Sequence, residues 1–350
     1  MSPRRRRIFR ALALGLILVV GLVAIGVVMI LQGRLIIHPM ADWRITSPVQ
    51  FVRQEYVAEP GYERTGHRYL YDPLLGWRNI PRWHATTFGQ PLTINSKGLR
   101  GPERTFAKPA GTRRVLVLGD SYAWGYSVGD DAVFSAVLEK MLRGGMEKWE
   151  VINTGVSGWG TDQEYLFLKQ EGLRYSPNVV VLAFFLLNDP QNNSASRQYG
   201  LDKPLFLNRN LELVNVPVPK PSPTNRVMET QAHPAELTLA LIERIAQLGR
   251  ENGWPLVVMK FGQFLEPDNA NIALQSRMFA QMVSRLPNVH YLDLDAQFRS
   301  RGLGEAQLTD ATIKNDGHWD ARGHAVVAEV LKGFLESQGL LAPNGARPTP

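Results

Sequence analysis

The sequence contains no cysteine among its 350 residues. This absence excludes a disulfide framework, thiolate zinc sites, iron–sulfur clusters and a cysteine nucleophile. It leaves the compartment open, because a core of this size folds without disulfides. Hydrophobic residues make up 44% and charged residues 20% of the chain, a globular composition that excludes wholesale disorder, collagen and coiled coil.

The chain also lacks a basic stripe of the kind that binds nucleic acid. Its formal net charge is +7, but five of the positive charges lie within the first ten residues, on Arg4, Arg5, Arg6, Arg7 and Arg10. The rest of the chain is therefore nearly neutral, and we predict no nucleic-acid partner.

Residues 11–31 form an apolar run without a charged residue, directly after these arginines. As a helix the run spans roughly 30 Å, the thickness of the hydrocarbon core of a bilayer. It is longer than the apolar region of a cleavable signal peptide, and no Ala-x-Ala pattern ends it. Because arginines stay on the cytoplasmic side, we predict a single-pass signal anchor in the cell inner membrane. Residues 1–10 would be cytoplasmic, and the body of the protein periplasmic or extracellular.

The remainder of the chain divides into three parts. Residues 32–112 are dense in aromatics, proline and glycine, which predicts a membrane-proximal irregular or β segment. Residues 113–340 form the main domain, and 341–350 a flexible tail. Within the main domain, 190–229 lacks periodicity and is rich in proline, which favours a lid-like insertion.

Short apolar runs alternate with helical patterns along the main domain. We predict strands at 115–118, 150–153, 178–187, 255–261 and 290–293, and helices from about 133, 161, 235, 272 and 321. The helix that begins at Thr161 has Glu164 in the place of a capping-box partner. This alternation predicts an α/β fold, in which a parallel sheet is covered by helices on both faces.

Polar residues that suit acyl-group chemistry stand at the ends of these predicted strands. Ser121 follows the first strand, Gly155 the second and Asn188 the third, while Asp316 and His318 precede the last helix. The carboxyl ends of parallel strands form the ligand-binding edge of such a sheet, so we expect these residues to meet there. Together they offer a nucleophile, donors for an oxyanion and an acid–base pair.

In these residues the chain resembles the SGNH/GDSL hydrolase superfamily, whose Ser, Gly, Asn and His blocks occur in this order. The resemblance covers roughly residues 113–339 and implies a flavodoxin-like three-layer sandwich, ester or thioester hydrolysis and no cofactor. It implies that Ser121 is the nucleophile, His318 the general base and Asp316 the residue that orients His318. It also implies an oxyanion hole made by the backbone N–H groups of Ser121 and Gly155 and the side-chain amide of Asn188.

Two places depart from the family pattern. Leu186 stands where the asparagine block has glycine, and Asn315 stands three residues before His318, where the family has aspartate. Asp316 lies only two residues before the histidine. The resulting Asp-x-His-Trp arrangement is similar to that of the alginate O-acetylation proteins.

Our main prediction is a membrane-anchored, exported serine esterase that acts on acyl esters of envelope lipid or carbohydrate. Two alternatives remain open. One is an O-acetyltransferase or deacetylase of an envelope polysaccharide, and the other is a catalytically inactive glycan-binding protein.

Asp316, His318, Asp320 and His324 are spaced closely enough to be taken for metal ligands. We expect Asp320 instead to cap the last helix, and His324 to lie on the surface or to serve packing. We likewise expect Asp120 to be a structural hydrogen-bond partner. The sequence therefore predicts no metal site.

Overall fold

The computed structural model describes residues 64–65, 69–144, 147–222, 224–309 and 317–342. The chain divides into two compact units, 1–54 and 55–350, and all described residues belong to the second. The predicted signal anchor at 11–31 lies outside the described residues. Among the residues that are described, no helix combines the length and apolar character needed to cross a membrane.

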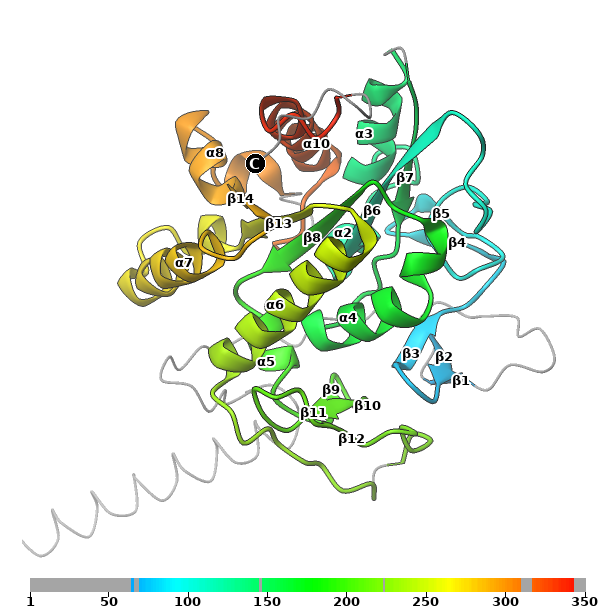
Figure 1. Ribbon diagram of the computed structural model, residues 1–350, viewed down its shortest axis with the longest axis vertical. Helices are drawn as coiled ribbons and strands as arrows, with labels where there is room; N and C mark the ends of the chain where they lie inside the picture. Colours follow the sequence, from blue (N-terminus) through cyan, green and yellow to red (C-terminus); the bar gives the residue numbers. More distant parts are fainter. Residues whose placement is uncertain (1–63, 66–68, 145–146, 223, 310–316, 343–350) are drawn as a thin grey trace, which may run out of the picture. The chain divides into compact units, whose positions relative to one another are not determined.

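A five-stranded parallel sheet forms the centre of the second unit (Figure 1). Its strands are β6 (Thr112–Gly119), β7 (Lys148–Asn153), β8 (Val179–Phe185), β13 (Leu256–Phe261) and β14 (Val289–Asp293). Their order in the sheet is β14-β13-β8-β6-β7. Counted along the chain this is the flavodoxin-like order 2-1-3-4-5, so the prediction of an α/β fold with a parallel sheet is confirmed.

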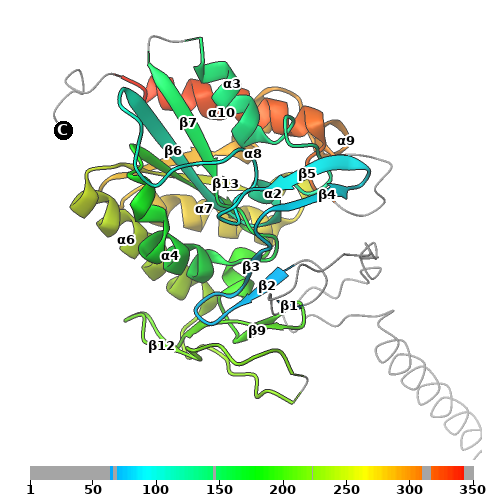
Figure 2. The same ribbon diagram turned by 90° about the vertical axis from the view of Figure 1, so that its right-hand side faces the viewer.

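Helices cover both faces of the sheet (Figures 1 and 2). On one face lie α4 (Thr161–Gln170), α6 (Pro234–Asn252) and α7 (Ala270–Val283), and on the other α3 (Phe134–Leu142), α8 (Leu294–Ser300) and α10 (Ala321–Ser337). Alternate residues of each strand feed the two cores, since Leu116 and Leu118 of β6 face one layer and Val115 and Val117 the other. The smaller helices are α2 (Ser121–Trp124), η1 (Gly172–Tyr175), α5 (Asp189–Asn192), η2 (Gln263–Leu265) and α9 (Glu305–Leu308).

One helix cap lies one residue away from its predicted position. As predicted, α4 begins at Thr161, but its N-cap is Gly160, whose N–H donates to Oε1 of Gln163 at 3.3 Å. The capping box therefore lies one residue earlier than the predicted pair of Thr161 and Glu164. As a result Glu164 does not cap the helix but is fully buried.

Short antiparallel strands precede the main sheet. They are β1 (Arg64–Thr65), β2 (Tyr69–Asp72) and β3 (Gly76–Asn79), which form one sheet, and the hairpin of β4 (Trp83–Thr87) and β5 (Gln90–Ile94). Trp77 of β3 is fully buried, and its backbone carbonyl accepts a hydrogen bond from Nε1 of Trp159 at 2.9 Å. Strand β3 is therefore packed on the same core as the main domain. Leu92 and Ile94 of β5 pack instead with Trp124 and Tyr126 in a smaller cluster.

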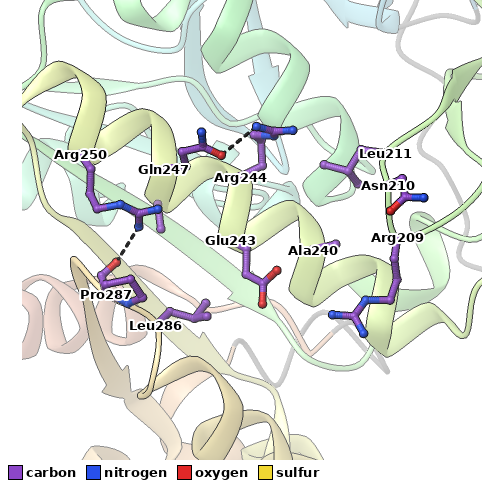
Figure 3. A pocket seen from close by; sticks show the side chains of 11 residues that line it. Arg209, Asn210, Leu211, Ala240, Glu243, Arg244, Gln247, Arg250, Leu286 and Pro287 are labelled. Carbon is purple, nitrogen blue, oxygen red and sulfur yellow. Dashed lines mark hydrogen bonds between the residues drawn. The ribbon is translucent and has the colours of Figure 1, made fainter.

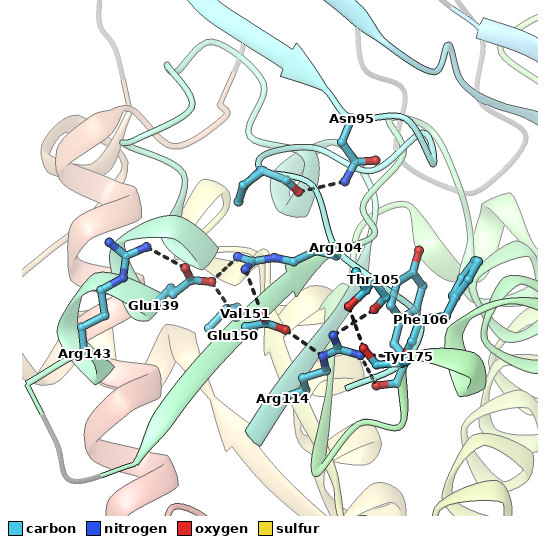
Figure 4. Close-up of polar contacts among 12 residues, drawn as sticks. Asn95, Arg104, Thr105, Phe106, Arg114, Glu139, Arg143, Glu150, Val151 and Tyr175 are labelled. Atoms are coloured by element: carbon cyan, nitrogen blue, oxygen red, sulfur yellow. Dashed lines mark hydrogen bonds and ion pairs between the residues drawn. The ribbon is translucent and has the colours of Figure 1, made fainter. Parts of the chain in front are cut away.

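A buried ionic network fastens the connection between these strands and β6 (Figure 4). The guanidinium of Arg114 is fully buried and donates to Oε2 of Glu150 at 2.8 Å and to the backbone carbonyls of Thr105 and Phe106. Arg104 pairs with Glu150 at 3.6 Å. Each charged group of this network therefore has a partner of opposite charge, which offsets the cost of burying it.

The insertion at 190–229 carries two small hairpins that the sequence did not predict. They pair β9 (Arg197–Gln198) with β10 (Leu201–Asp202), and β11 (Leu205–Phe206) with β12 (Leu213–Val214). Between them the ammonium group of Lys203 is fully buried and forms an ion pair with Asp162 of α4. The described residues of the insertion are thus tied into the main domain.

Candidate active site

Ser121 is placed by the turn that joins β6 to α2. A Cβ on Gly119 would lie 2.6 Å from Cβ of Ala123, so only glycine allows the chain to turn this tightly. Asp120 caps α2 by accepting the N–H of Tyr122 at 2.9 Å. Ser121 is then the first residue of the helix, and its own N–H has no acceptor within the helix.

The structure brings Ser121 and His318 together from opposite ends of the main domain. Nε2 of His318 lies 2.7 Å from Oγ of Ser121, a hydrogen-bond distance. The histidine comes from the segment that leads into α10, while the serine follows β6, which lies between β8 and β7 in the sheet. A hydroxyl next to an imidazole at a sheet's carboxyl edge is the arrangement of an activated serine nucleophile.

Asp316 and Asn315, the candidates for orienting His318, both lie in the segment 310–316. That segment is outside the described residues. The assignment of Asp316 therefore stays a prediction.

Asn188 lies at the same edge, after β8. Its side-chain Nδ2 donates to Oδ2 of the buried Asp120 at 3.0 Å. An amide nitrogen carries two hydrogens, so Nδ2 can donate to a second acceptor as well. Asp120 thus orients Asn188 and caps α2 at once, which confirms that it acts as a structural hydrogen-bond partner.

Two glycines compete for the role of the remaining backbone donor. The N–H of Gly155 is directed to Oδ1 of Asn153 at 2.9 Å, so it would reach an oxyanion only by leaving that bond. Gly158 has a φ of +82° and is half-buried, and within the described residues its N–H has no hydrogen-bond acceptor. Gly158 is not among the predicted site residues, although a second glycine in the same turn is a signal for it.

Three fully buried carboxyl groups, Asp120, Glu164 and Asp189, interact electrostatically around this site. Burial raises the pKa of each, and the neighbouring carboxylates raise the pKa of Glu164 and Asp189 further. Both oxygens of Glu164 are without a hydrogen-bond partner among the described residues. We therefore expect Glu164 to be held neutral, which keeps negative charge away from a developing oxyanion.

Two of the four residues that are spaced like metal ligands, Asp320 and His324, have other roles. Oδ1 of Asp320 accepts the N–H of Gly323 at 2.7 Å and caps α10, as predicted. His324 is buried, and its Nδ1 accepts the N–H of Phe134 at 3.2 Å, which confirms a packing role. Trp319 is fully buried in the core beneath α10. Among the residues that the structure describes, no three acidic or histidine side chains gather as metal ligands.

One hollow among the described residues lies away from this site (Figure 3). It measures about 520 Å³ and lies between α6, the residues around Asn210 and the loop before β14. Arginines 209, 244 and 250 line it, and none of the predicted site residues does. The site is therefore assigned by side-chain geometry and not by the size of a cavity.

Comparison with known proteins gives a family and several similar folds. The model of the GDSL-like lipase/acylhydrolase family matches residues 117–326. No curated protein sequence matches the chain. Solved structures similar to it include TesA (16% identity, TM-score 0.45, 65% of this chain and 100% of that one). They also include Axe2, an acetylxylan esterase from Geobacillus stearothermophilus (15% identity, TM-score 0.42, 64% of this chain and 94% of that one). A third is LAE5, an alpha/beta hydrolase enzyme from the metagenome of Lake Arreo, Spain (15% identity, TM-score 0.44, 64% of this chain and 95% of that one).

Proposed function

Since the chain belongs to the GDSL-like lipase/acylhydrolase family and is a serine-dependent hydrolase of carboxylic esters, we propose that Ser121 is its nucleophile and His318 its general base. The observation that carries this proposal is the 2.7 Å separation of Oγ and Nε2. The two atoms are already within proton-transfer distance, so little reorganisation is needed before attack.

In this mechanism Oγ of Ser121 attacks the acyl carbon while Nε2 of His318 takes the hydroxyl proton. The tetrahedral intermediate collapses as the histidine gives that proton to the leaving alcohol, which leaves the acyl group on Ser121. Water, deprotonated by His318, then releases the carboxylic acid and restores the serine. Asp316 holds the imidazole tautomer and stabilises the imidazolium.

The oxyanion is bound by the N–H of Ser121, by Nδ2 of Asn188 and by a glycine N–H. The first is the unsatisfied donor at the start of α2, and the second is held in place by Asp120. Gly155, or Gly158 with its unoccupied N–H, completes the set. One such donor contributes about 2.7–4 kcal/mol to the transition state.

The enzyme works outside the cytoplasm, anchored in the inner membrane by residues 11–31. The run of apolar residues behind five arginines supports this placement. A tethered esterase meets acyl groups of the cell envelope, so we propose envelope lipid or acylated carbohydrate as its substrate.

Acetyl transfer to an envelope polysaccharide is the second candidate, favoured by the sequence Asp316-Gly317-His318-Trp319. The acyl-serine intermediate is the same, and only the acceptor differs, a sugar hydroxyl in place of water. Incubation with an acetyl donor and an added oligosaccharide separates the two functions. A hydrolase releases acetate at a rate that does not depend on the oligosaccharide. A transferase acetylates the oligosaccharide.

The proposed roles are tested by hydrolysis of short acyl esters. Ser121→Ala and His318→Ala should each abolish turnover while the melting temperature stays within about 2 °C of wild type. Turnover by Ser121→Ala at the wild-type rate would overturn the assignment. A native protein that neither hydrolyses esters nor accepts a serine-directed fluorophosphonate would support the inactive glycan-binding alternative.

A further inference from the structure

We propose that Tyr122 and Tyr126 are positioning residues that hold the imidazole of His318 for proton transfer, an inference that rests on the proposed function. Both rings pack against the imidazole. The ring centroid of Tyr122 lies 4.6 Å from that of His318 at an interplanar angle of 30°, and that of Tyr126 lies 4.6 Å away at 42°. We call these two residues the tyrosine pair.

The tyrosine pair belongs to the same short segment as the nucleophile. Tyr122 directly follows Ser121 in α2, and the backbone N–H of Tyr126 donates to the carbonyl of Ser121 at 3.0 Å. The rings that contact the base are therefore fixed relative to the serine that the base must deprotonate.

Tyr122 is anchored on every side. It is 2% exposed, and its ring contacts those of Phe185, Phe261 and Trp319 at centroid distances of 4.7–4.8 Å. Its hydroxyl donates to the backbone carbonyl of Gly317 at 2.8 Å. Tyr122 thus fixes both the ring of His318 and the backbone just before it.

Tyr126 links the histidine to the hairpin of β4 and β5. It is 5% exposed, and its ring meets that of Phe88 edge-on at a centroid distance of 5.0 Å. Phe88 lies at the tip of that hairpin, between β4 and β5. The strands that precede the main domain therefore support the proposed base through one aromatic contact.

This arrangement suits a base that becomes a cation. When Nε2 of His318 takes the serine proton, the imidazolium forms against two aromatic faces, whose negative charge density attracts it. Packing also restricts rotation of the ring away from Oγ of Ser121. Both effects act on proton transfer and leave ground-state binding of the ester unchanged.

Variants of Tyr126 separate ring contact from simple packing. Tyr126→Leu removes the aromatic face, whereas Tyr126→Phe keeps it. We expect Tyr126→Leu to lower kcat and the rate of fluorophosphonate labelling about tenfold, with KM changed less than about twofold. Tyr126→Phe should restore nearly wild-type values.

Tyr122→Phe tests the second anchor, since it keeps the ring and removes the hydrogen bond that the hydroxyl donates to Gly317. We expect kcat to fall about threefold to tenfold. Tyr71→Phe is the matched control, because Tyr71 also donates its hydroxyl to a backbone carbonyl, that of Val218. This control should leave kcat unchanged.

If Tyr126→Leu does not fold, an NMR measurement on the native protein still tests the proposal. The ring protons of His318, assigned in native protein by comparison with His318→Gln, should resonate upfield of an exposed histidine because of the neighbouring rings. An unshifted resonance would overturn the proposal. So would equal turnover of the leucine and phenylalanine variants, or a loss confined to KM and melting temperature. Failure of the proposed function is distinct, since wild-type protein would then neither hydrolyse esters nor take the label.

Discussion

At the scale of single residues, the orientation of His318 turns on its two neighbours Asn315 and Asp316. Asn315 has the family spacing but a neutral amide, which cannot stabilise an imidazolium through charge. Asp316 has the carboxylate, and Gly317, whose φ is +71°, gives the backbone freedom between it and the histidine. We therefore propose Asp316 as the residue that orients His318.

This assignment predicts that Asp316→Asn loses at least about a hundredfold in kcat, because the amide favours the wrong tautomer of His318. Asn315→Ala should lose much less. Steady-state kinetics and melting temperatures of both variants check the prediction, and the melting temperatures should stay close to wild type. If Asn315→Ala is the more damaging, the site is a Ser–His dyad supported by Asn315.

His324 is a second histidine with a definite pH signature. Burial, together with the charges of Arg100 and His318, lowers its pKa to about 3. In the unfolded chain this histidine becomes protonated as the pH falls through about 6.5. In the folded state it stays neutral until about pH 3. Stability from this residue is therefore complete above pH 7 and is lost as the pH falls from about 6.5, by about 1.4 kcal/mol per pH unit.

His324→Asn should remove that pH dependence, since Oδ1 of asparagine can still accept the N–H of Phe134 but does not titrate. Urea unfolding between pH 5 and pH 8 measures the effect. The variant is expected to have a lower free energy of unfolding than wild type at pH 8. The difference between the two free energies should decrease as the pH falls. Parallel profiles for the two proteins would show that His324 does not titrate on unfolding.

Residue type and position predicted that Ser121 and His318 meet at the edge of the sheet and that Asp320 caps the last helix, because each stands beside an element boundary. The competition between Gly155 and Gly158 could not be predicted in this way. It depends on whether the side chain of Asn153 reaches one N–H, which is settled by packing. The contacts of Tyr122 with His318 likewise join residues almost two hundred positions apart.

At the scale of elements, alternating apolar runs predicted all five strands of the main sheet and the helices between them. Those elements carry strong periodicity over their whole length. The hairpins β9–β10 and β11–β12 have strands of two residues each, too short for any alternation to register. Their places are set instead by long-range contacts such as that between Lys203 and Asp162.

That ion pair predicts that the insertion is a structural part of the domain. Burial lowers the pKa of Lys203 and raises that of Asp162, while their attraction opposes both shifts. Lys203→Met would leave the carboxyl of Asp162 buried without its cation, at a cost of about 3–5 kcal/mol. The double variant Lys203→Met/Asp162→Asn should recover part of that loss.

Chemical denaturation of both variants measures these changes. Lys332→Met is the matched control, because Lys332 pairs with Glu336 on the exposed surface of α10, where a pair contributes about 0.2–1 kcal/mol. A Lys203→Met protein as stable as this control would mean that the insertion is held by other contacts. It would then be a better candidate for a moving lid.

At the scale of the whole molecule, the proposed membrane topology rests on the unequal distribution of positive charge along the chain. Five arginines precede an apolar run, and the remainder of the chain is nearly neutral. We expect protease added to intact spheroplasts to degrade the body of the protein while a cytoplasmic control protein survives. A body that is protected until the spheroplasts are lysed would reverse the proposed topology.

The most direct test of the whole proposal is to find where a serine-directed fluorophosphonate attaches to the native protein. Mass spectrometry of the digested protein should show one label per chain, on Ser121. Ser121→Ala should take none, and His318→Ala should react at least about a hundredfold more slowly, because its serine has no base. A label on another residue, or labelling of Ser121→Ala at the wild-type rate, would contradict Ser121 as the nucleophile.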